Sequence, residues 1–308
     1  MNLITRSDFD GLACAVLLEE AGIIDNYKFV HPKDVQDGKV EVTKDDVLAN
    51  VPYVSGCGLW FDHHSSEEER LKMTSKMKFE GRSQQAPSCA RVIYDYYGGA
   101  GRFKKFDESG LMWAVDKSDS ADLTKDEILK PSGWILLSFI MDARTGLGRY
   151  RDYRISNVQL MTDMIKYCRT MKVDDILEIP DVKERVERYF IQEEQYDAMV
   201  KAHARVDGNV LIIDLRDLDE ILSGNRFVEY VLYPEQNVSI RIIWGKMKQN
   251  VVFTTGYSII NHTCKADIGS LMLRYGGGGH RAVGTCQVPF AEAEATLKAI
   301  IDYLKANN

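Results

Sequence analysis

The feature that most constrains this chain is an apolar run that ends in three polar residues. Leu59-Trp60-Phe61 leads directly into Asp62-His63-His64. A short apolar run of this kind predicts a buried strand, and open α/β sheets place their ligand sites at the carboxyl tips of strands. One carboxylate and two imidazoles suit Mn²⁺, Fe²⁺ or Zn²⁺ better than Ca²⁺. From the triplet alone, a capping Asp with two solvent-facing His is an equally open interpretation.

A second polar turn separates a strand-like run over 1–5 from a helix-forming stretch over 12–20 that ends at Gly22. The turn contains Asp8 and Asp10, followed by Gly11. In extended backbone, residues two apart share a side, so both carboxylates are expected to face the same way. One Asp would suffice to cap the helix. Two carboxylates beside a glycine favour a cation site.

Further apolar runs predict a mostly parallel sheet with polar strand tips. Three more strands are expected over 28–31, 46–50 and 111–115, and polar residues end or follow them: His31, Asn50 and Asp116. Such strands alternating with helical stretches are typical of parallel α/β domains. After Asp116, directly at its strand tip, Asp119 and Asp122 are expected in a solvated loop.

A helix is expected between Pro87 and Gly98. Ser88 at its start favours the role of helix cap, with donation to a substrate phosphate as the alternative. Residues 130–205 have apolar residues at helical spacing, and the charged stretch 181–194 is expected to be an exposed or connecting helix.

The pattern changes after residue 207. A strand over 210–214, a hairpin over 238–257, and helices over 267–275 and 291–305 predict a smaller α/β unit. The predicted fold class is therefore α/β with two domains. We expect an N-terminal domain over 1–190 with a mostly parallel sheet and flanking helices, a linker helix over 191–206, and a C-terminal domain over 207–308.

Four consecutive glycines, Gly276 to Gly279, precede His280 and Arg281 in the C-terminal part. Glycine lets the backbone approach a ligand closely, and His280 and Arg281 add donors beside exposed amides. A flexible helix C-cap would need only one glycine. The run therefore favours a cradle for a phosphate or a carboxylate.

Composition limits the partners of this chain. The net charge is −7 and the pI is about 5.5, whereas general nucleic-acid coat proteins are usually basic. A short substrate is thus favoured over duplex DNA. The six cysteines contain no CxxC pair, as expected of reduced thiols in a cytoplasmic protein. No signal-peptide pattern or membrane span is expected.

The motifs Asp8-Phe9-Asp10-Gly11, Asp62-His63-His64, Asp116 and Gly276 to His280, in this order, resemble the DHH phosphoesterase superfamily. The resemblance is closer to members with a C-terminal DHH-associated domain, which include nanoRNase-type oligoribonucleases, exopolyphosphatase-related proteins and RecJ-type exonucleases. It implies a catalytic and a substrate-binding domain, an active site in the cleft between them, and Mn²⁺-dependent hydrolysis of phosphoester or phosphoanhydride bonds.

The resemblance also implies a role for individual residues. One metal site would use Asp8, and a second site would use Asp10, His63 and Asp116. Asp62 would bind a metal ion or orient the groups beside it. His64 would face the substrate phosphate. The residues implied to bind the terminal phosphate or the nucleotide are Gly277, Gly278, Gly279, His280 and Arg281, with Arg241 and Ser88 as further candidates.

Two positions depart from the family pattern. A His that usually precedes the first Asp is missing, since Ile4 to Ser7 contains none, and Asn50 stands where a metal-bridging Asp is usual. Asn50 can ligate through its carbonyl oxygen but brings no charge. Arg6 is expected to supply cationic charge near the phosphate. We therefore expect one or two divalent ions per chain, with the first site weakened.

The predicted function is metal-dependent hydrolysis of linear 5′-phosphorylated dinucleotides or very short oligonucleotides, including dinucleotides derived from cyclic dinucleotide signals. Two alternatives stay open: a polyphosphate or pyrophosphate hydrolase, for which the motif regions provide few cations, and a catalytically silent nucleotide-binding module. The sequence leaves the oligomeric state undetermined, with a homodimer as one option.

Overall fold

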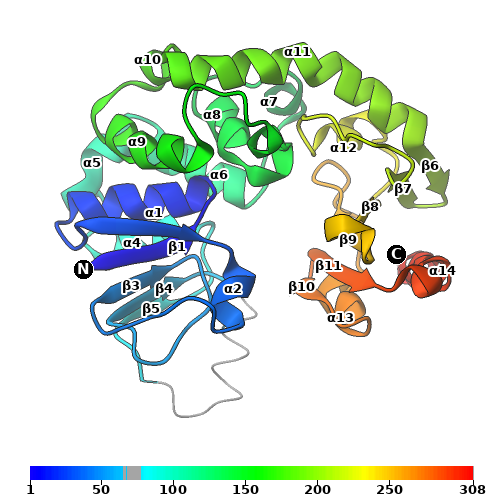
Figure 1. The fold of residues 1–308 in the computed structure, drawn as a ribbon, viewed down its shortest axis with the longest axis horizontal. Helices are drawn as coiled ribbons and strands as arrows, with labels where there is room; N and C mark the ends of the chain where they lie inside the picture. Colours follow the sequence, from blue (N-terminus) through cyan, green and yellow to red (C-terminus); the bar gives the residue numbers. More distant parts are fainter. Residues whose placement is uncertain (65–66, 68–77, 308) are drawn as a thin grey trace. The chain divides into compact units, whose positions relative to one another are not determined.

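The computed structural model describes residues 1–64, 67 and 78–307. The chain forms two compact α/β units, which Figure 1 shows in sequence colours. One comprises Met1–Leu123 and Lys130–Phe190, and the other Thr124–Leu129 and Ile191–Asn308. The predicted α/β fold class with two sheets is confirmed.

The first unit contains a five-stranded sheet in the order β2-β1-β3-β4-β5, with every neighbouring pair parallel. Its strands are β1 (Asn2–Arg6), β2 (Asn26–Val30), β3 (Asp46–Ala49), β4 (Leu59–Asp62) and β5 (Gly81–Ser83). Strands β3 and β4 are buried along their whole length, as expected for parallel strands covered on both faces.

Helices cover both faces of this sheet. Helix α1 packs against β1, α4 and α9, whereas Val35 of α2 packs with Leu48 and Trp60 on the other face. The helices of this unit are α1 (Phe9–Glu20), α2 (Pro32–Gln36), α4 (Cys89–Tyr96), α5 (Ala100–Glu108), α6 (Leu111–Asp119), α8 (Gly133–Met141), α9 (Asn157–Thr170) and α10 (Val173–Leu177). In such a layered arrangement, the strand tips are the part of the sheet that a ligand can reach.

The turn between β1 and α1 depends on Asp8 and Gly11. Asp8 has extended backbone and caps α1, accepting a hydrogen bond from the Gly11 N–H at 2.9 Å. A Cβ atom on Gly11 would lie 2.0 Å from the Arg6 carbonyl oxygen. Only glycine therefore lets α1 begin this close to the end of β1.

One predicted strand is wrong. The apolar run Leu111–Val115 begins helix α6, which continues to Asp119. Such a short run does not distinguish a buried strand from a buried helix segment by periodicity. Gly110, with φ of 80°, precedes the helix. As a result, Asp116 lies within a helix rather than at a strand tip.

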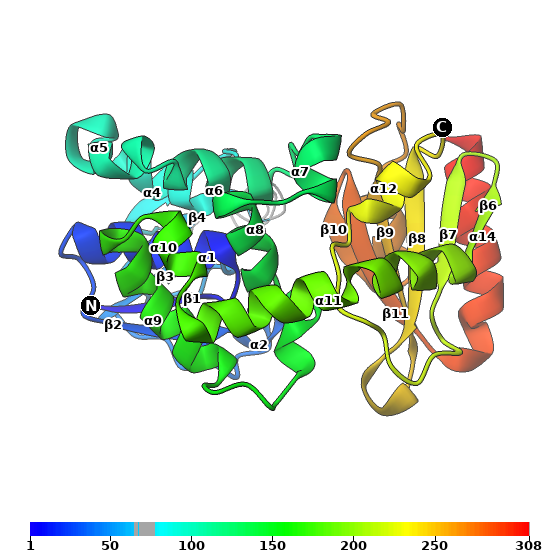
Figure 2. The same cartoon turned by 90° about the horizontal axis from the view of Figure 1, so that it is seen from above.

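The second unit contains a six-stranded mixed sheet in the order β10-β11-β9-β8-β7-β6, in which only β7 and β8 are parallel. Side chains of this sheet, including Ile212, Ile240 and Phe253, form a core with Met272 of α13 and Ile300 of α14. Figure 2 shows α14 running beside β6 and β7. The strands are β6 (Ala204–Asp207), β7 (Val210–Asp214), β8 (Val238–Trp244), β9 (Val251–Tyr257), β10 (Gly278–His280) and β11 (Val283–Val288).

The helices of the second unit include α11 (Pro180–His203), which begins in the first unit. The expected linker over 191–206 thus comprises the second part of α11 and the start of β6. The other helices are α7 (Lys125–Leu129), α12 (Val228–Leu232), α13 (Ile268–Leu273) and α14 (Ala293–Ala306). Within the described residues, none of the helices has the length and apolar character needed to cross a membrane. All six cysteines lie in the described part as free thiols.

Candidate metal centre

Polar side chains gather at the carboxyl edge of the parallel sheet, as the sequence predicts. Asp8 follows β1, Asn50 follows β3, and Asp62 ends β4 with His63 directly after it. Because β1, β3 and β4 are adjacent and parallel, their ends meet at one edge. Asp8, Asn50 and Asp62 are all buried there.

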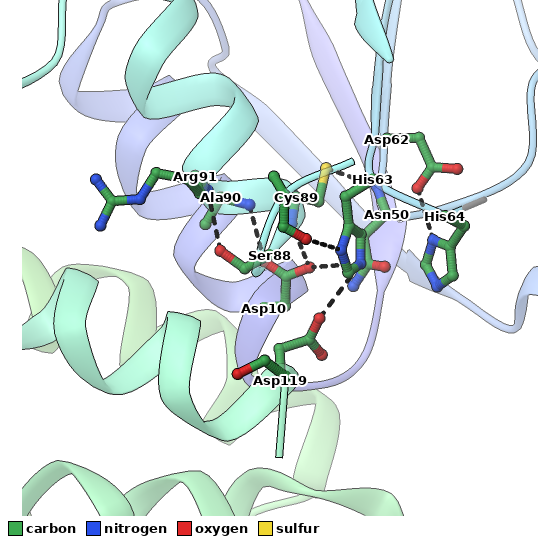
Figure 3. A network of polar contacts seen from close by, with 12 residues as sticks. Asp10, Asn50, Asp62, His63, His64, Ser88, Cys89, Ala90, Arg91 and Asp119 are labelled. Atoms are coloured by element: carbon green, nitrogen blue, oxygen red, sulfur yellow. Dashed lines mark hydrogen bonds and ion pairs between the residues drawn. The ribbon is translucent and has the colours of Figure 1, made fainter. Parts of the chain in front are cut away.

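A compact cluster beside this edge consists of Asp10 from α1, His63 after β4 and Asp119 at the end of α6, as Figure 3 shows. The His63 Nε2 atom lies 3.2 Å from an Asp119 carboxylate oxygen and 3.8 Å from an Asp10 carboxylate oxygen. One ligand atom from each of Asp10, His63 and Asp119 lies within 4.8 Å of the other two. We call this set the Asp10–His63–Asp119 cluster. Two carboxylates and an imidazole form a donor set that suits Mn²⁺, Fe²⁺ or Zn²⁺.

The hydrogen bond of His63 orients its ring toward the cluster. Its Nδ1 atom lies 3.2 Å from the carbonyl oxygen of Ala86. A carbonyl oxygen only accepts, so Nδ1 carries a proton, and Nε2 faces Asp10 and Asp119, where its lone pair can bind a metal ion. A divalent cation would satisfy this lone pair and both carboxylates together, so the residues fit a metal ion.

The electrostatics of the cluster also favour a cation. Burial raises the pKa of the Asp10 carboxyl well above its usual value, and the negative charges of Asp119 and Asp8 raise it further. The backbone N–H groups of Cys89 and Ala90, at the start of α4, donate to Asp10 at 3.0 and 2.8 Å and oppose this shift. The close carboxylates repel one another, and a bound cation would remove that repulsion.

Asp116, which the sequence analysis placed among the metal ligands, binds elsewhere in the structure. Its carboxylate accepts hydrogen bonds from Ser88 Oγ at 2.7 Å and from Arg91 Nε at 2.9 Å. Asp119, expected in a solvated loop, is the residue that reaches His63. The physical reason is that α6 is a helix, in which residues three apart lie one turn from each other. The Asp116-Lys117-Ser118-Asp119 spacing would have indicated this if the segment had been predicted as helical.

Asp8 and Asn50 were also predicted as ligands, and in the structure Asp8 contacts both Asn50 and Arg6. Asn50 Nδ2 donates to Asp8 Oδ1 at 3.1 Å, and Arg6 Nε pairs with Asp8 Oδ2 at 2.9 Å. Asp8 Oδ1 also caps α1 through Gly11. Chain donors therefore occupy both oxygens of Asp8, and the guanidinium of Arg6 supplies the positive charge beside it.

The buried Asp62 and the partly buried His64 form a pair beside the cluster. Asp62 is fully buried, and its Oδ1 atom lies 2.7 Å from His64 Nδ1. Burial opposes the charge of His64, but the hydrogen bond and the negative charge of Asp62 raise the pKa of His64 to about 9. His64 therefore carries a positive charge at neutral pH. The buried Oδ2 atom of Asp62 has no hydrogen-bond partner among the described residues.

The glycine run of the second unit, predicted as a cradle for a phosphate or a carboxylate, is partly a strand. Gly278, Gly279 and His280 form β10, antiparallel to β11. A Cβ atom on Gly277 would lie 2.1 Å from the Thr285 carbonyl oxygen, and one on Gly279 would lie 2.2 Å from that of Val283. A Cβ atom on Gly278 would meet open space. Close packing thus explains Gly277 and Gly279, while only Gly278 keeps the character of an open cradle.

These contacts predict different outcomes for two neighbouring substitutions. Gly277→Ala should lower the free energy of unfolding by about 2 kcal/mol, because the new methyl group overpacks against the backbone of β11. Gly278→Ala, the matched control, should change it little. Denaturant unfolding of both variants measures this difference. Equal stabilities would show that β10 does not pack on β11 in this way.

The remaining predicted substrate-binding residues already have partners within the chain. Arg241 is paired with the buried Glu229 at 2.5 Å, and Arg281 donates to the Lys265 carbonyl oxygen at 3.3 Å. Ser88 caps α4 by accepting from the Arg91 N–H at 3.0 Å, so the predicted capping role is confirmed. Their binding roles stay predictions.

No protein-family model and no curated protein sequence matches the chain. Among solved structures, it is similar to the pGpG-specific phosphodiesterase PggH from Vibrio cholerae, with 46% identity and a TM-score of 0.82 over 100% of this chain and 99% of that one. It also shares its fold with the DHH domain of PF0399, described as a member of the s1p family of ribosomal proteins, at 13% identity and a TM-score of 0.55 over 98% of this chain and 85% of that one. The predicted family is thereby confirmed: the chain belongs to the DHH phosphoesterase superfamily.

Proposed function

We propose that this chain is a phosphodiesterase that hydrolyses linear 5′-phosphorylated dinucleotides such as pGpG to mononucleotides. The observation that carries this proposal is the 46% identity to a pGpG-specific phosphodiesterase over the whole length of both chains. The Asp10–His63–Asp119 cluster supports it, because metal-assisted hydrolysis of a phosphodiester needs a site of this kind.

We infer that the cluster holds one divalent ion, with Mn²⁺ as the candidate that best suits two carboxylates and one imidazole. Such an ion, when bound, lowers the pKa of a water molecule and polarises a phosphoryl oxygen. The pairing of Asp8 with Arg6 and Asn50 supports a single ion, because the oxygens of Asp8 already accept hydrogen bonds from the chain.

Two cationic side chains would act on the substrate phosphate. Asp62 holds the protonated ring of His64 in place, so an imidazolium stabilises the charge that develops on the phosphoryl oxygens. Arg6 pairs with Asp8 through Nε. Its guanidinium group places a positive charge at the same strand edge, and guanidinium groups bind phosphate oxygens well.

The two alternative functions receive less support from the site. A polyphosphate hydrolase needs many cations to hold a polyanion, whereas the cations described near the strand edge are Arg6, His64 and Arg144, beside four carboxylates. A silent binding module would have no evident use for the buried Asp10 carboxylate, whose pKa the neighbouring charge of Asp119 raises, whereas a bound cation would offset that repulsion. The six free thiols fit a cytoplasmic location.

A substrate panel tests the proposal. The purified chain is incubated with Mn²⁺ and either pGpG, pApA, longer 5′-phosphorylated oligonucleotides, cyclic dinucleotides or polyphosphate, and initial rates are compared. We expect kcat/KM to be highest for a linear dinucleotide. Equal rates on dinucleotides and decanucleotides would favour a processive exonuclease, and faster release of phosphate from polyphosphate would favour the first alternative.

A 5′ phosphate is expected to contribute to binding through His280. Removing that phosphate from the dinucleotide should lower kcat/KM about 10-fold, because a charge-assisted hydrogen bond is lost. His280→Ala should cause a similar loss. The two losses should not add, since both remove one interaction. Kinetics of the four enzyme and substrate combinations measure this coupling.

His262→Ala provides the control for that experiment. His262 is an exposed histidine of the same unit, and its loss should leave the effect of the 5′ phosphate unchanged. Additive losses for His280→Ala and phosphate removal would show that His280 does not bind this phosphate.

A further inference from the structure

A cavity of about 440 Å³ opens in the first unit and has no role in the site described above. Its volume lies in the range of small-molecule sites. It is lined by Pro87, Arg91, Asp107, Trp113, Asp116, Lys117, Ser120 and Asp122. We call it the Trp113 cavity.

The residues that line the Trp113 cavity are close in sequence to residues of the metal centre. Asp116 lines the cavity one helical turn before Asp119, and Trp113 lies about 9 Å before Asp119 along the axis of α6. Pro87, another lining residue, follows Ala86, whose carbonyl oxygen binds His63. A nucleotide with its phosphate at the cluster can thus reach the cavity with its base.

Trp113 provides a flat apolar surface for such a base. Its side chain is 53% exposed, in contrast to the buried Trp60 and Trp134. The ammonium group of Lys117 lies 5.6 Å from the centroid of the Trp113 ring. An exposed indole beside a cation is a stacking platform of the kind that binds nucleobases.

The hydrogen-bonding groups beside the ring match one base. Asp122 and Lys117 both line the cavity, and their backbones meet because Ala121 adopts a left-handed conformation (φ 58°) and the Asp122 N–H donates to the Lys117 carbonyl oxygen at 3.0 Å. The carboxylates of Asp116 and Asp107 already accept from Arg91 and the Tyr94 hydroxyl. The carboxylate of Asp122 accepts no hydrogen bond from the described residues, so it is available to a ligand.

A carboxylate next to a cation distinguishes guanine from adenine. The guanine edge offers the N1–H and N2–H donors to a carboxylate, and its O6 atom accepts from an ammonium group. Adenine has an unprotonated N1 atom and cannot donate twice to one carboxylate. A cavity lined by both Asp122 and Lys117 therefore offers the groups that guanine needs.

We propose that the Trp113 cavity binds a guanine base of the dinucleotide, stacked on Trp113 and hydrogen-bonded by Asp122 and Lys117. This inference rests on the proposed function and adds the residues that select the base. Trp113 and Asp122 would act as specificity-determining residues, because they contact the base and not the reacting phosphate.

Kinetics with two dinucleotides test the proposal. Asp122→Asn should reduce the preference for pGpG over pApA, measured as the ratio of their kcat/KM values, about 10-fold. Trp113→Ala should raise KM about 10-fold for both substrates, because stacking tolerates any base. Asp45→Asn, an exposed Asp of the same unit, is the matched control and should behave like the wild type. A base preference unchanged in Asp122→Asn would overturn the assignment of guanine.

A binding experiment separates this inference from the proposed function. GMP, titrated without metal, should quench tryptophan fluorescence of the full chain, and Trp113→Phe should abolish that quenching. AMP should bind more weakly. If no dinucleotide is hydrolysed, the proposed function fails, while quenching by GMP still reports on the cavity. If hydrolysis proceeds but neither quenching nor KM depends on Trp113, the cavity does not bind the base.

Discussion

Asp119→Asn is expected to lower the rate of dinucleotide hydrolysis at least about 100-fold and to weaken Mn²⁺ binding by a similar factor. Asp119 lies 3.2 Å from His63 and belongs to the cluster of possible ligands. The amide keeps the shape of the side chain but removes the negative charge that attracts a metal ion. Calorimetric titration with Mn²⁺ measures the affinity without reference to turnover, and initial rates measure the activity.

Asp116→Asn is the matched control, one helical turn away in α6. It should weaken the contact with Arg91 and Ser88 and leave the number of bound ions unchanged. The reverse pattern, with metal binding lost in Asp116→Asn and kept in Asp119→Asn, would restore the ligand set that the sequence alone predicted.

Asn50→Asp is expected to make the stability of the chain depend on metal. Asn50 is buried and donates to Asp8 at 3.1 Å, so an aspartate there would bring two buried carboxylates together. Without metal, we expect the free energy of unfolding to fall by about 3 kcal/mol, because Arg6 is the one cation paired with Asp8 among the described residues. With Mn²⁺, an ion bound between the two carboxylates should restore most of it and add a second ion per chain.

Thermal unfolding with a chelator and with Mn²⁺ tests this expectation, together with the stoichiometry from calorimetry. Asn225→Asp is the control, since Asn225 is a buried asparagine of the second unit that donates to the Ile128 carbonyl oxygen. This variant should unfold at a lower temperature than the wild type, both with a chelator and with Mn²⁺. Equal recovery in both variants, or none in Asn50→Asp, would show that no cation can bind between residues 8 and 50.

Strand tips were the part of the site that could be predicted from the sequence. The run into Asp62-His63-His64 and the Asp8 to Gly11 turn mark the ends of β4 and β1, and parallel strands bring these ends to one edge. Local hydrophobic pattern and turn chemistry determine such elements, so the meeting of Asp10 and His63 at this edge could be predicted before the fold was known.

Long-range contacts decided what the pattern left open. The apolar run Leu111–Val115 fits a buried strand as well as a buried helix. Because it forms helix α6, Asp119 rather than Asp116 lies beside His63. Likewise, the spacing of Gly277 and Gly279 does not reveal that β11 lies against them. The missing information in both cases was which segment, distant in sequence, forms the contact.

The sequence by itself determined the α/β class, the order of the two units and the residue types at the strand edge, because these follow from periodicity and from short motifs. Only the tertiary structure decided which carboxylates lie together beside His63 and which are bound by arginine. Asp8 and Asp116 face Arg6 and Arg91, whereas Asp10 and Asp119 face His63. The physical reason is that a carboxylate binds whichever positive or donor group the packing places within a few ångströms of it. The number of residues between two groups in the sequence does not predict that distance.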